Sequence, residues 1–370
     1  MQKILSLHWG FSIGGVGKYA SIIDKVSDYS DVHIKSACIL SNDRQVDSNT
    51  LNELKDKVII SRSNSLNLNW IKELKQCAAE FEPDLIITHG FNAHFIALTC
   101  LPLYAKVCTY HGDYHANTVQ KRILGLFFNR FTEYFISKKT LGCICVARYC
   151  KTYLENKNIS SNKLTVIHNG INEKNPTSNN REILRQEWSV TEDEILLGVA
   201  SRLDPVKGIS YLIDTFQLLS EKYKNIKLVV IGVGTLEEKL KEQALKHKLQ
   251  KSIVFTGFRN DINDCLNAID IFILPSLEEY HSIALLEAMR ASKQIVATNV
   301  GGNTESVRHD QEGLIVASKS SHEIAAAVSK LLENPEKGKE LAIAAKKRFS
   351  QFFTEKTTVL KTANWLENIK

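Results

Sequence analysis

Short apolar runs alternate with longer stretches of helical period along the whole chain. Continuous apolar runs of about four to eight residues are typical of strands buried on both faces of a parallel sheet, and helices between them favour βαβ connections. The pattern predicts strands at 3–9, 32–40, 58–62, 84–89, 106–111, 142–147, 164–168, 195–201, 228–232, 253–258, 270–274, 294–300 and 313–316. It predicts helices at 17–27, 68–80, 92–101, 118–139, 321–332 and 335–349. We therefore expect an α/β protein with doubly wound parallel sheets.

The length predicts two domains. A chain of 370 residues exceeds the size of about 250–300 residues at which a single core usually stops growing. The polar run around Pro176 lies between the two series of strands and reads as a linker. We expect an N-terminal domain at 1–172, a linker at 173–182, a C-terminal domain at 183–350 and a final segment at 351–370.

The composition, with 44% hydrophobic and 24% charged residues, is that of an ordinary globular protein. No apolar run approaches the roughly 18 residues of a membrane span, and the N-terminus enters a strand without a signal-peptide pattern. The eight cysteines include no CxxC pair, so we expect reduced thiols and a cytoplasmic location. His, Cys and Asp do not cluster with the spacing of metal ligands, so we expect no metal site.

Positive charge is concentrated in the first half of the chain. Lysine and arginine outnumber aspartate and glutamate by 20 to 14 in residues 1–170, whereas both groups number 27 in residues 171–370. A basic first half suits an anionic partner there, such as a membrane surface or a phosphorylated acceptor. A chance imbalance on a solvated surface explains the same numbers equally well.

Residues 118–139 combine apolar positions at helical period with Lys121, Arg122, Arg130, Lys138 and Lys139. A helix of this kind can lie in a membrane interface. The same period also suits a helix packed on the core. Both alternatives stay open from these residues.

The stretch from 270 to 305 reads as strand, loop, helix, strand, glycine turn and helix. Glu279 lies in the loop, the first helix begins near Ser282, and Glu287 lies within that helix. Helix starts beyond the carboxyl ends of parallel strands suit phosphate, and carboxylates accept hydrogen bonds from paired sugar hydroxyls. Eight helical residues rise about 12 Å, which is roughly the reach across a nucleoside diphosphate. Each carboxylate alone could be a solvated acid of a helix start, whereas the whole unit favours a ligand site.

Two cations, Arg202 and Lys207, follow the strand at 195–201 in the turn RLDPVKG. Pro205 stiffens this turn and Gly208 opens the next helix. Cations at the carboxyl edge of a sheet suit a diphosphate, although a solvated turn would look similar.

The first loop, GFSIGGVGK, contains Gly14, Gly15 and Gly17. Glycines let the backbone approach a ligand closely, and one alternative is a P-loop. Tyr19 argues against that alternative, because a P-loop needs a Ser or Thr hydroxyl there for magnesium.

The stretch around Glu279 resembles the C-terminal signature of glycosyltransferase family 4, the retaining, nucleotide-sugar-dependent enzymes of GT-B fold. The matching residues are Glu279, Glu287-Ala288-Met289, Val300-Gly301-Gly302 and Glu305. The resemblance extends over nearly the whole chain. It implies two Rossmann-like doubly wound domains that face a cleft, with the segment 351–370 crossing back to the first domain as a helix.

The resemblance also implies roles for single residues. Arg202 and Lys207 would neutralise the leaving diphosphate, Glu279 would hold sugar hydroxyls, and Glu287 would hold the ribose. His111 would contact the donor sugar near the reacting carbon. The other implied donor-binding residues are Gly14 and Gly15 near the diphosphate, the backbone at His281, Ser282 and Ile283, and Phe258 and Arg259 near the base. Tyr280 and His281 depart from the family pattern of Gly followed by an aromatic residue or Leu, and a bulkier pair could narrow the sugar pocket.

The expected function is retaining transfer of a sugar from a UDP- or GDP-type donor to a hydroxyl of a glycan or lipid-linked glycan. Bacterial surface polysaccharide synthesis, such as lipopolysaccharide synthesis, is the expected setting. We expect no cofactor, metal or nucleic acid, and a cytoplasmic location with or without peripheral contact to the inner face of the membrane. The alternatives are a nucleotide-sugar epimerase of the same fold, a P-loop-like ATPase and a noncatalytic binding protein.

Overall fold

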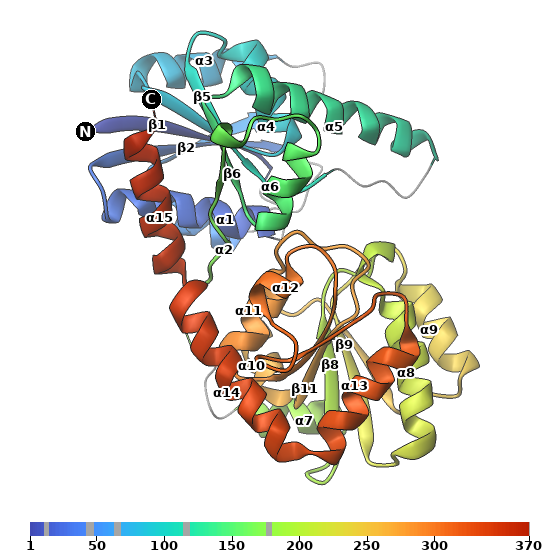
Figure 1. The fold of residues 1–370 in the computed structure, drawn as a ribbon. Helices are drawn as coiled ribbons and strands as arrows, with labels where there is room; N and C mark the ends of the chain where they lie inside the picture. Colours follow the sequence, from blue (N-terminus) through green and yellow to red (C-terminus); the bar gives the residue numbers. More distant parts are fainter. Residues whose placement is uncertain (11–14, 42–47, 63–67, 114–118, 175–179, 370) are drawn as a thin grey trace. The chain divides into compact units, whose positions relative to one another are not determined.

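The chain divides into two compact units in a computed structural model (Figure 1). Unit 1 comprises Met1–Asn169 and Glu355–Lys370, and unit 2 comprises Gly170–Thr354. The structure describes residues 1–10, 15–41, 48–62, 68–113, 119–174 and 180–369. Gly14 and residues 175–179 of the expected linker therefore lie outside the described residues.

Unit 1 is built on a seven-stranded parallel sheet in the order β3-β2-β1-β4-β5-β6-β7. All strands expected in this half are present, within three residues at each end. They are β1 (Gln2–Trp9), β2 (Val32–Ser41), β3 (Lys57–Arg62), β4 (Leu85–His89), β5 (Ala105–Tyr110), β6 (Gly142–Cys145) and β7 (Leu164–Val166).

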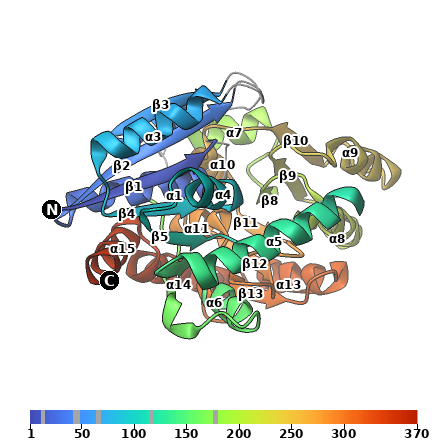
Figure 2. The ribbon, with the colours of Figure 1, turned by 90° about the horizontal axis from the view of Figure 1, so that it is seen from above.

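Helices cover both faces of this sheet (Figures 1 and 2). On one face lie α1 (Gly15–Asp24) and the last helix, α15 (Glu355–Asn368), and their apolar residues share one core with β1, β4 and β5. On the other face lie α3 (Asn69–Phe81), α4 (Phe91–Cys100) and α5 (Val119–Lys139). The short helices α2 (Ser48–Glu53) and α6 (Arg148–Glu155) complete the α-helices described in this unit.

Unit 2 contains a six-stranded parallel sheet in the order β10-β9-β8-β11-β12-β13. Its strands are β8 (Ile195–Ala200), β9 (Ile226–Ile231), β10 (Ile253–Gly257), β11 (Ile271–Leu274), β12 (Gln294–Thr298) and β13 (Leu314–Val316). One core lies under α8 (Ile209–Lys222), α9 (Glu237–Lys246) and α13 (Ser321–Glu333). The opposite core lies under α7 (Asn180–Glu187), α10 (Ile262–Ala268), α11 (Ile283–Arg290) and α14 (Pro335–Phe352).

Both sheets have the strand order of a Rossmann fold, which confirms the expected fold class. In such a sheet the order reverses at one point, and ligands bind there, beyond the carboxyl ends of the strands. The switch point lies between β1 and β4 in unit 1 and between β8 and β11 in unit 2. The site of each unit is therefore expected at the ends of these strands.

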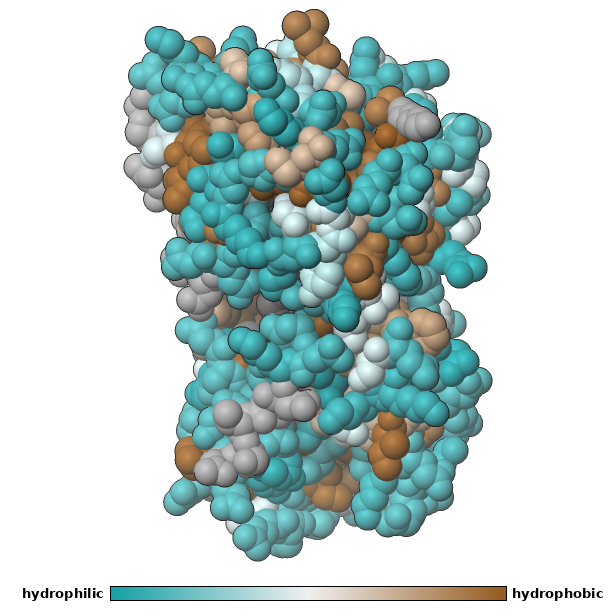
Figure 3. All heavy atoms as spheres, turned by 90° about the vertical axis from the view of Figure 1, so that its left-hand side faces the viewer, coloured by the Kyte–Doolittle hydropathy of each residue, from teal (hydrophilic) through white to brown (hydrophobic). Residues whose placement is uncertain are grey.

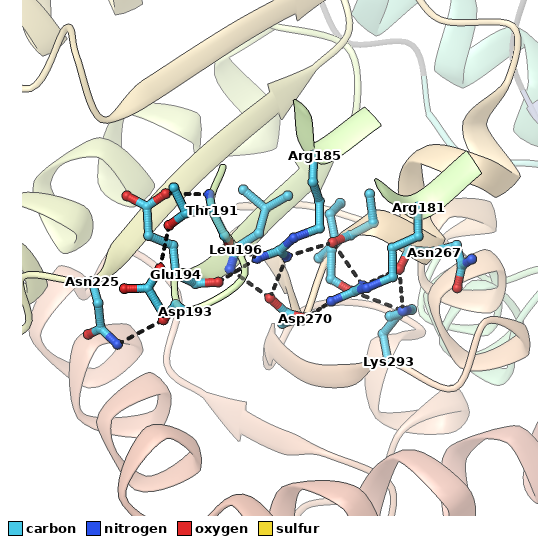
Figure 4. A network of polar contacts seen from close by, with 12 residues as sticks. Arg181, Arg185, Thr191, Asp193, Glu194, Leu196, Asn225, Asn267, Asp270 and Lys293 are labelled. Atoms are coloured by element: carbon cyan, nitrogen blue, oxygen red, sulfur yellow. Dashed lines mark hydrogen bonds and ion pairs between the residues drawn. The ribbon is translucent and has the colours of Figure 1, made fainter. Parts of the chain in front are cut away.

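A polar network at the amino-terminal ends of β8 and β11 fixes α7 to the second sheet (Figure 4). Arg181 and Arg185 of α7 contact the two carboxylate oxygens of Asp270 at 2.5 and 3.0 Å. The Asp270 carboxylate also accepts a hydrogen bond from the N–H of Leu196 at 2.8 Å. Lys293 donates to the carbonyls of residues 267 and 269 just beside it, and burial lowers the pKa of this lysine to about 8. The helix that follows the undescribed segment thus belongs firmly to unit 2.

Candidate active site

The loop after β11 brings together two residues that the sequence predicted separately, Lys207 and Glu279. The Lys207 Nζ lies 2.7 Å from Oε1 of Glu279, and the Ser276 hydroxyl donates to the same oxygen at 2.8 Å. The Lys207 side chain is 19% exposed and that of Glu279 is 8% exposed. This cluster lies at the β8/β11 switch point, where a fold of this type binds its ligand.

Two glycines hold this loop from both sides. A Cβ on Gly208 would lie 2.1 Å from the carbonyl oxygen of Pro275, and one on Gly301 would lie 1.5 Å from that of Glu279. Both glycines have a positive φ, of +66° and +51°. Only glycine combines this backbone conformation with such close approach. The loops after β8 and β12 therefore position the backbone that carries Glu279.

Arg202 follows β8 and its side chain is 67% exposed. Its guanidinium lies 2.5 Å from the carboxylate of Asp204, and the Thr235 hydroxyl donates to that carboxylate at 3.3 Å. The sequence reasoning missed Asp204 and Ser276. The only signal for Asp204 was a polar residue beside the proline of the turn. The only signal for Ser276 was a polar residue just after a buried strand.

Helix α11 begins as predicted. Ser282 is its N-cap, and the Ser282 hydroxyl accepts a hydrogen bond from the N–H of Leu285 at 3.4 Å. Ile283 is the first residue of the helix, and Glu287 lies one turn further, with only 7% of it exposed. A buried acid in an apolar helix is unusual, so its position favours a binding role over a solvated helix-start acid.

The unusual pair Tyr280 and His281 makes contacts within unit 2. The His281 Nε2 lies 3.2 Å from the Ser306 hydroxyl, and the imidazole ring lies 5.5 Å from the ring of Phe353. The Tyr280 hydroxyl donates to Glu278 at 3.1 Å. The His281 ring is thus packed toward α12 (Asn303–Ser306) and the end of α14.

Phe258 and Arg259 follow β10, and they differ in how freely their side chains can contact a ligand. The Phe258 side chain is 46% exposed, so its ring can stack on a flat ligand. The Arg259 guanidinium is engaged by Asp261 at 2.5 Å and by Glu187 at 2.8 Å. Its hydrogen bond to Asp261, followed by these negative charges, raises the pKa of Arg259. Of the two, Phe258 is the better placed to contact a base.

Unit 1 carries a row of histidines at its own switch point. His8 lies near the end of β1, His89 ends β4, and His111 directly follows β5. The Ser6 hydroxyl lies 2.8 Å from Nε2 of His8 and 3.2 Å from Nε2 of His89, and these two rings stack at 4.8 Å. The sequence reasoning singled out His111 alone. The available signal was a histidine at or next to the end of three strands, but the strand order that makes these strands neighbours could not be read from the sequence.

The Tyr19 ring lies 5.8 Å from His89 and 4.9 Å from His111, edge-on to both. Nδ1 of His89 and Nε2 of His111 are buried without a hydrogen-bond partner in the described structure. Burial lowers the pKa of His8 to about 3 and that of His111 to about 4, and it lowers the pKa of His89 well below the usual value. These imidazoles are therefore neutral at physiological pH, and His111 Nε2 is suited to a hydrogen bond with a sugar hydroxyl.

Gly15 is the first residue of α1, so this glycine lies at a helix start beyond β1. Within the described residues, His, Cys, Asp and Glu form no group of three or more that could hold a metal ion. The described helices also include none that is long and apolar enough to cross a membrane.

Two parallel sheets of Rossmann strand order, with cations and carboxylates at the switch point of the second, are the features expected of a GT-B glycosyltransferase. Residues 180–348 match the family described as "Glycosyl transferases group 1", and residues 42–175 match "Glycosyltransferase Family 4". Both models describe glycosyltransferases and together they cover most of the chain, which confirms the resemblance to glycosyltransferase family 4. The epimerase and ATPase alternatives find no support in these matches.

Curated relatives agree with this assignment. An uncharacterized glycosyltransferase, MJ1607 of Methanocaldococcus jannaschii, is 29% identical over 68% of this chain and 66% of its own length. The Escherichia coli UDP-Gal:alpha-D-GlcNAc-diphosphoundecaprenol alpha-1,3-galactosyltransferase is 24% identical over 68% of each chain. The matched part thus spans about two thirds of each relative.

Solved structures share the fold. Anabaena Alr3699/HepE in complex with UDP-glucose has a TM-score of 0.86 and 22% identity, covering 99% of this chain and 100% of the other. WaaG, a glycosyltransferase involved in lipopolysaccharide biosynthesis, has a TM-score of 0.76 and 17% identity, covering 99% and 100%.

Proposed function

We propose that this protein is a retaining glycosyltransferase that moves a sugar from a nucleotide-sugar donor to a hydroxyl of a glycan or lipid-linked glycan. The observation that carries the proposal is the cluster of Lys207, Glu279 and Ser276 at the switch point of unit 2. This cluster supports the proposal because a cation suited to a diphosphate lies directly beside a carboxylate suited to sugar hydroxyls.

The difficult step is the breaking of the bond between the anomeric carbon and the diphosphate oxygen. Lys207, Arg202 and the N–H groups at the start of α11 would stabilise the charge that develops on the leaving diphosphate. A leaving phosphate oxygen would take the proton of the acceptor hydroxyl, so neither a protein base nor a metal is required. This differs from glycoside hydrolysis, in which two carboxylates share the work.

The binding roles follow the same geometry. Glu279, with one oxygen already held by Lys207 and Ser276, would accept hydrogen bonds from the sugar with its other oxygen. Glu287 would bind the ribose and Phe258 would stack on the base. His111 of unit 1 has a buried Nε2 without a hydrogen-bond partner among the described residues, which suits it to a hydrogen bond with a sugar hydroxyl.

The relatives suggest where to look for the substrates. The Escherichia coli relative is named for UDP-Gal and a GlcNAc-diphosphoundecaprenol acceptor, and one structural neighbour is in complex with UDP-glucose. We therefore propose a UDP-sugar donor and a lipid-linked acceptor in surface polysaccharide synthesis, which would bring the enzyme to the inner face of the membrane.

Turnover tests the proposal. The protein is incubated with single UDP- and GDP-sugars and a lipid-linked sugar acceptor, and released nucleoside diphosphate and the anomeric configuration of the product are measured. We expect release that depends on the acceptor and a product with the donor's configuration. Epimerised donor without transfer, or an inverted product, would overturn the proposal.

A further inference from the structure

Helix α11 ends in a buried cation. Arg290 is the last residue of this helix, and only 4% of it is exposed. Charged side chains normally remain in water, and on the face shown in Figure 3 hydrophilic residues predominate, with apolar ones in small separate groups. A cation that is held out of water costs free energy unless its contacts compensate for the lost hydration. The contacts of Arg290 must therefore account for its burial.

The guanidinium of Arg290 joins three segments of unit 2. Its Nη1 donates to the backbone carbonyl of Asn172 at 2.9 Å and to the side-chain oxygen of the same residue at 2.8 Å. Its Nη2 donates to Oδ1 of Asn263. Asn263 lies in the first turn of α10, and Asn172 lies near the start of unit 2, which begins at Gly170. One side chain thus connects two helices and the segment by which the chain enters unit 2.

The acceptors of Arg290 are neutral. Within the part of the chain that the structure describes, its hydrogen bonds all run to amide oxygens. Burial lowers the pKa of Arg290, and the negative charge of Glu287, one turn earlier in the same helix, opposes this effect. The C-terminus of a helix favours a cation, but it does so at the surface as well. Because an apolar side chain could fill a core position without the cost of a buried charge, stability alone does not explain Arg290.

The two helices that Arg290 joins belong to the proposed nucleoside site. Glu287, proposed for the ribose, lies on α11 three residues before Arg290. Phe258, proposed for the base, lies in the loop that leads from β10 into α10, five residues before Asn263. Helices α10 and α11 lie side by side and share one core (Figure 1). The hydrogen bond from Arg290 to Asn263 therefore fixes the start of α10, and with it the loop of Phe258, relative to the helix of Glu287.

We propose that Arg290 is a positioning residue of the donor site, which holds the carboxylate for the ribose and the ring for the base at the spacing of one nucleoside. It acts through Asn263, while its two hydrogen bonds to Asn172 hold the guanidinium itself in place. The planar fork of arginine suits this role, because it donates in several fixed directions at once, whereas lysine is a point charge. The inference rests on the proposed function, since only a nucleotide donor brings a nucleoside to this site.

Binding of UDP and GDP, measured by calorimetry, tests the positioning role. Native protein is compared with Arg290→Met, which removes the three hydrogen bonds, and with the matched control Arg185→Met. Arg185 is similarly buried and also contacts α10, but at the other end of the helix, where it donates to the carbonyl of Ala268 at 3.3 Å. Both variants should lower the melting temperature. We expect Arg290→Met to bind the nucleotide that native protein prefers about tenfold more weakly, and the control to stay within about twofold of native.

A milder variant isolates the contact with α10. Asn263→Ala leaves Arg290 bound to Asn172 and should weaken nucleotide binding by about threefold. Because Arg290 acts through Asn263, the double variant Arg290→Met/Asn263→Ala should bind no more weakly than Arg290→Met alone. In transfer assays both single variants should raise the donor KM, whereas kcat should change by less than about threefold, because Lys207 and Glu279 keep their contact.

Equal nucleotide affinity of native protein, Arg290→Met and Asn263→Ala would overturn the positioning role. So would an equal loss of affinity in Arg185→Met, because the loss would then follow general destabilisation, and additive losses in the double variant would contradict action through Asn263. If Arg290→Met does not fold, Asn263→Ala decides alone: weaker binding supports the role and unchanged binding overturns it. Native protein that binds neither UDP nor GDP would contradict the proposed function and this inference together.

Discussion

Glu279 is held by a cation and a hydroxyl before any donor arrives. Lys207 and Ser276 both contact its Oε1, which fixes the carboxylate and leaves Lys207 beside the place proposed for the diphosphate. A preorganised charge of this kind stabilises a transition state without reorganisation during the reaction. Removal of either Lys207 or Glu279 would leave the other as an unpaired charge that is largely buried, which costs folding free energy.

The Lys207–Glu279 pair is expected to be coupled in stability and in catalysis. Lys207→Met or Glu279→Gln alone should lower the free energy of unfolding by about 2–3 kcal/mol, and the double variant should lose less than the sum. Each single variant should also lower kcat by about 100-fold or more. Urea unfolding and donor-saturated kinetics measure both. Strict additivity of the two stability losses would contradict the pairing.

Gly301 is expected to tolerate no side chain. Gly301→Ala places a methyl group against the Glu279 carbonyl, whereas Gly257→Ala, also at a positive φ of +69°, meets nothing within 4 Å. The control should lose about 1 kcal/mol through backbone strain alone. Gly301→Ala should lose clearly more and weaken donor binding as well. Melting temperatures and donor titrations compare the two, and equal losses would show that the contact with Glu279 does not matter.

At the scale of elements, cations stabilise the end of α10. Arg181 donates to the carbonyls of residues 267 and 268, and Lys293 donates to those of 267 and 269. Cations at a helix C-terminus interact favourably with its free carbonyls. Asp270, which follows directly, balances part of this charge (Figure 4). The network ties α7, α10 and β11 into one body.

Asp270→Asn should therefore destabilise unit 2. It leaves Arg181 and Arg185 without their carboxylate, and Arg185 is only 9% exposed. We expect a loss of about 2 kcal/mol in the free energy of unfolding. Glu336→Gln, which breaks an exposed pair with Lys339, should change it by less than about 0.5 kcal/mol. Equal effects in denaturant titrations would mean that the network has no special role.

The elements were largely predictable because strands buried on both faces leave continuous apolar runs. The run at 271–274 and the N-cap at Ser282 were read directly. The pairing of Lys207 with Glu279 was not predictable, because these residues are far apart in the sequence and meet only through the order of β8 and β11. The histidine row of unit 1 remained hidden for the same reason. The helix at 118–139 was predicted, but its period alone could not separate its packed face from its exposed one.

At the scale of the whole molecule, the two units differ in their buried titratable groups. Unit 1 contains His8, His89, His94 and His111, whose pKa values are all lowered by burial, to about 3 for His8 and His94 and about 4 for His111. An unfolded chain protonates these groups near pH 6.5, whereas the folded unit does not. As pH falls below 6.5, the unfolded state therefore binds more protons and gains stability relative to the folded state.

Acid should consequently unfold unit 1. We expect its free energy of unfolding to be constant above about pH 7 and to fall between pH 6.5 and about 4, with each histidine contributing up to about 1.4 kcal/mol per pH unit. Hydrogen exchange followed by mass spectrometry, corrected for the intrinsic pH dependence, resolves the two units. Protection in β1, β4 and β5 that does not weaken over this range would contradict the neutral histidine row.

Unit 2 is proposed to bind a nucleotide sugar at the β8/β11 switch point. Thermal stabilisation by UDP-, GDP- and ADP-sugars tests it directly on the native protein, Arg202→Ala and Glu287→Gln, because a ligand that binds the folded state raises the melting temperature. We predict that one sugar nucleotide, of UDP type, stabilises the native protein and that both variants lose the shift. Stabilisation by ATP with magnesium, and by no sugar nucleotide, would contradict nucleotide-sugar binding. It would favour instead a P-loop-like ATPase that uses the glycine loop before α1.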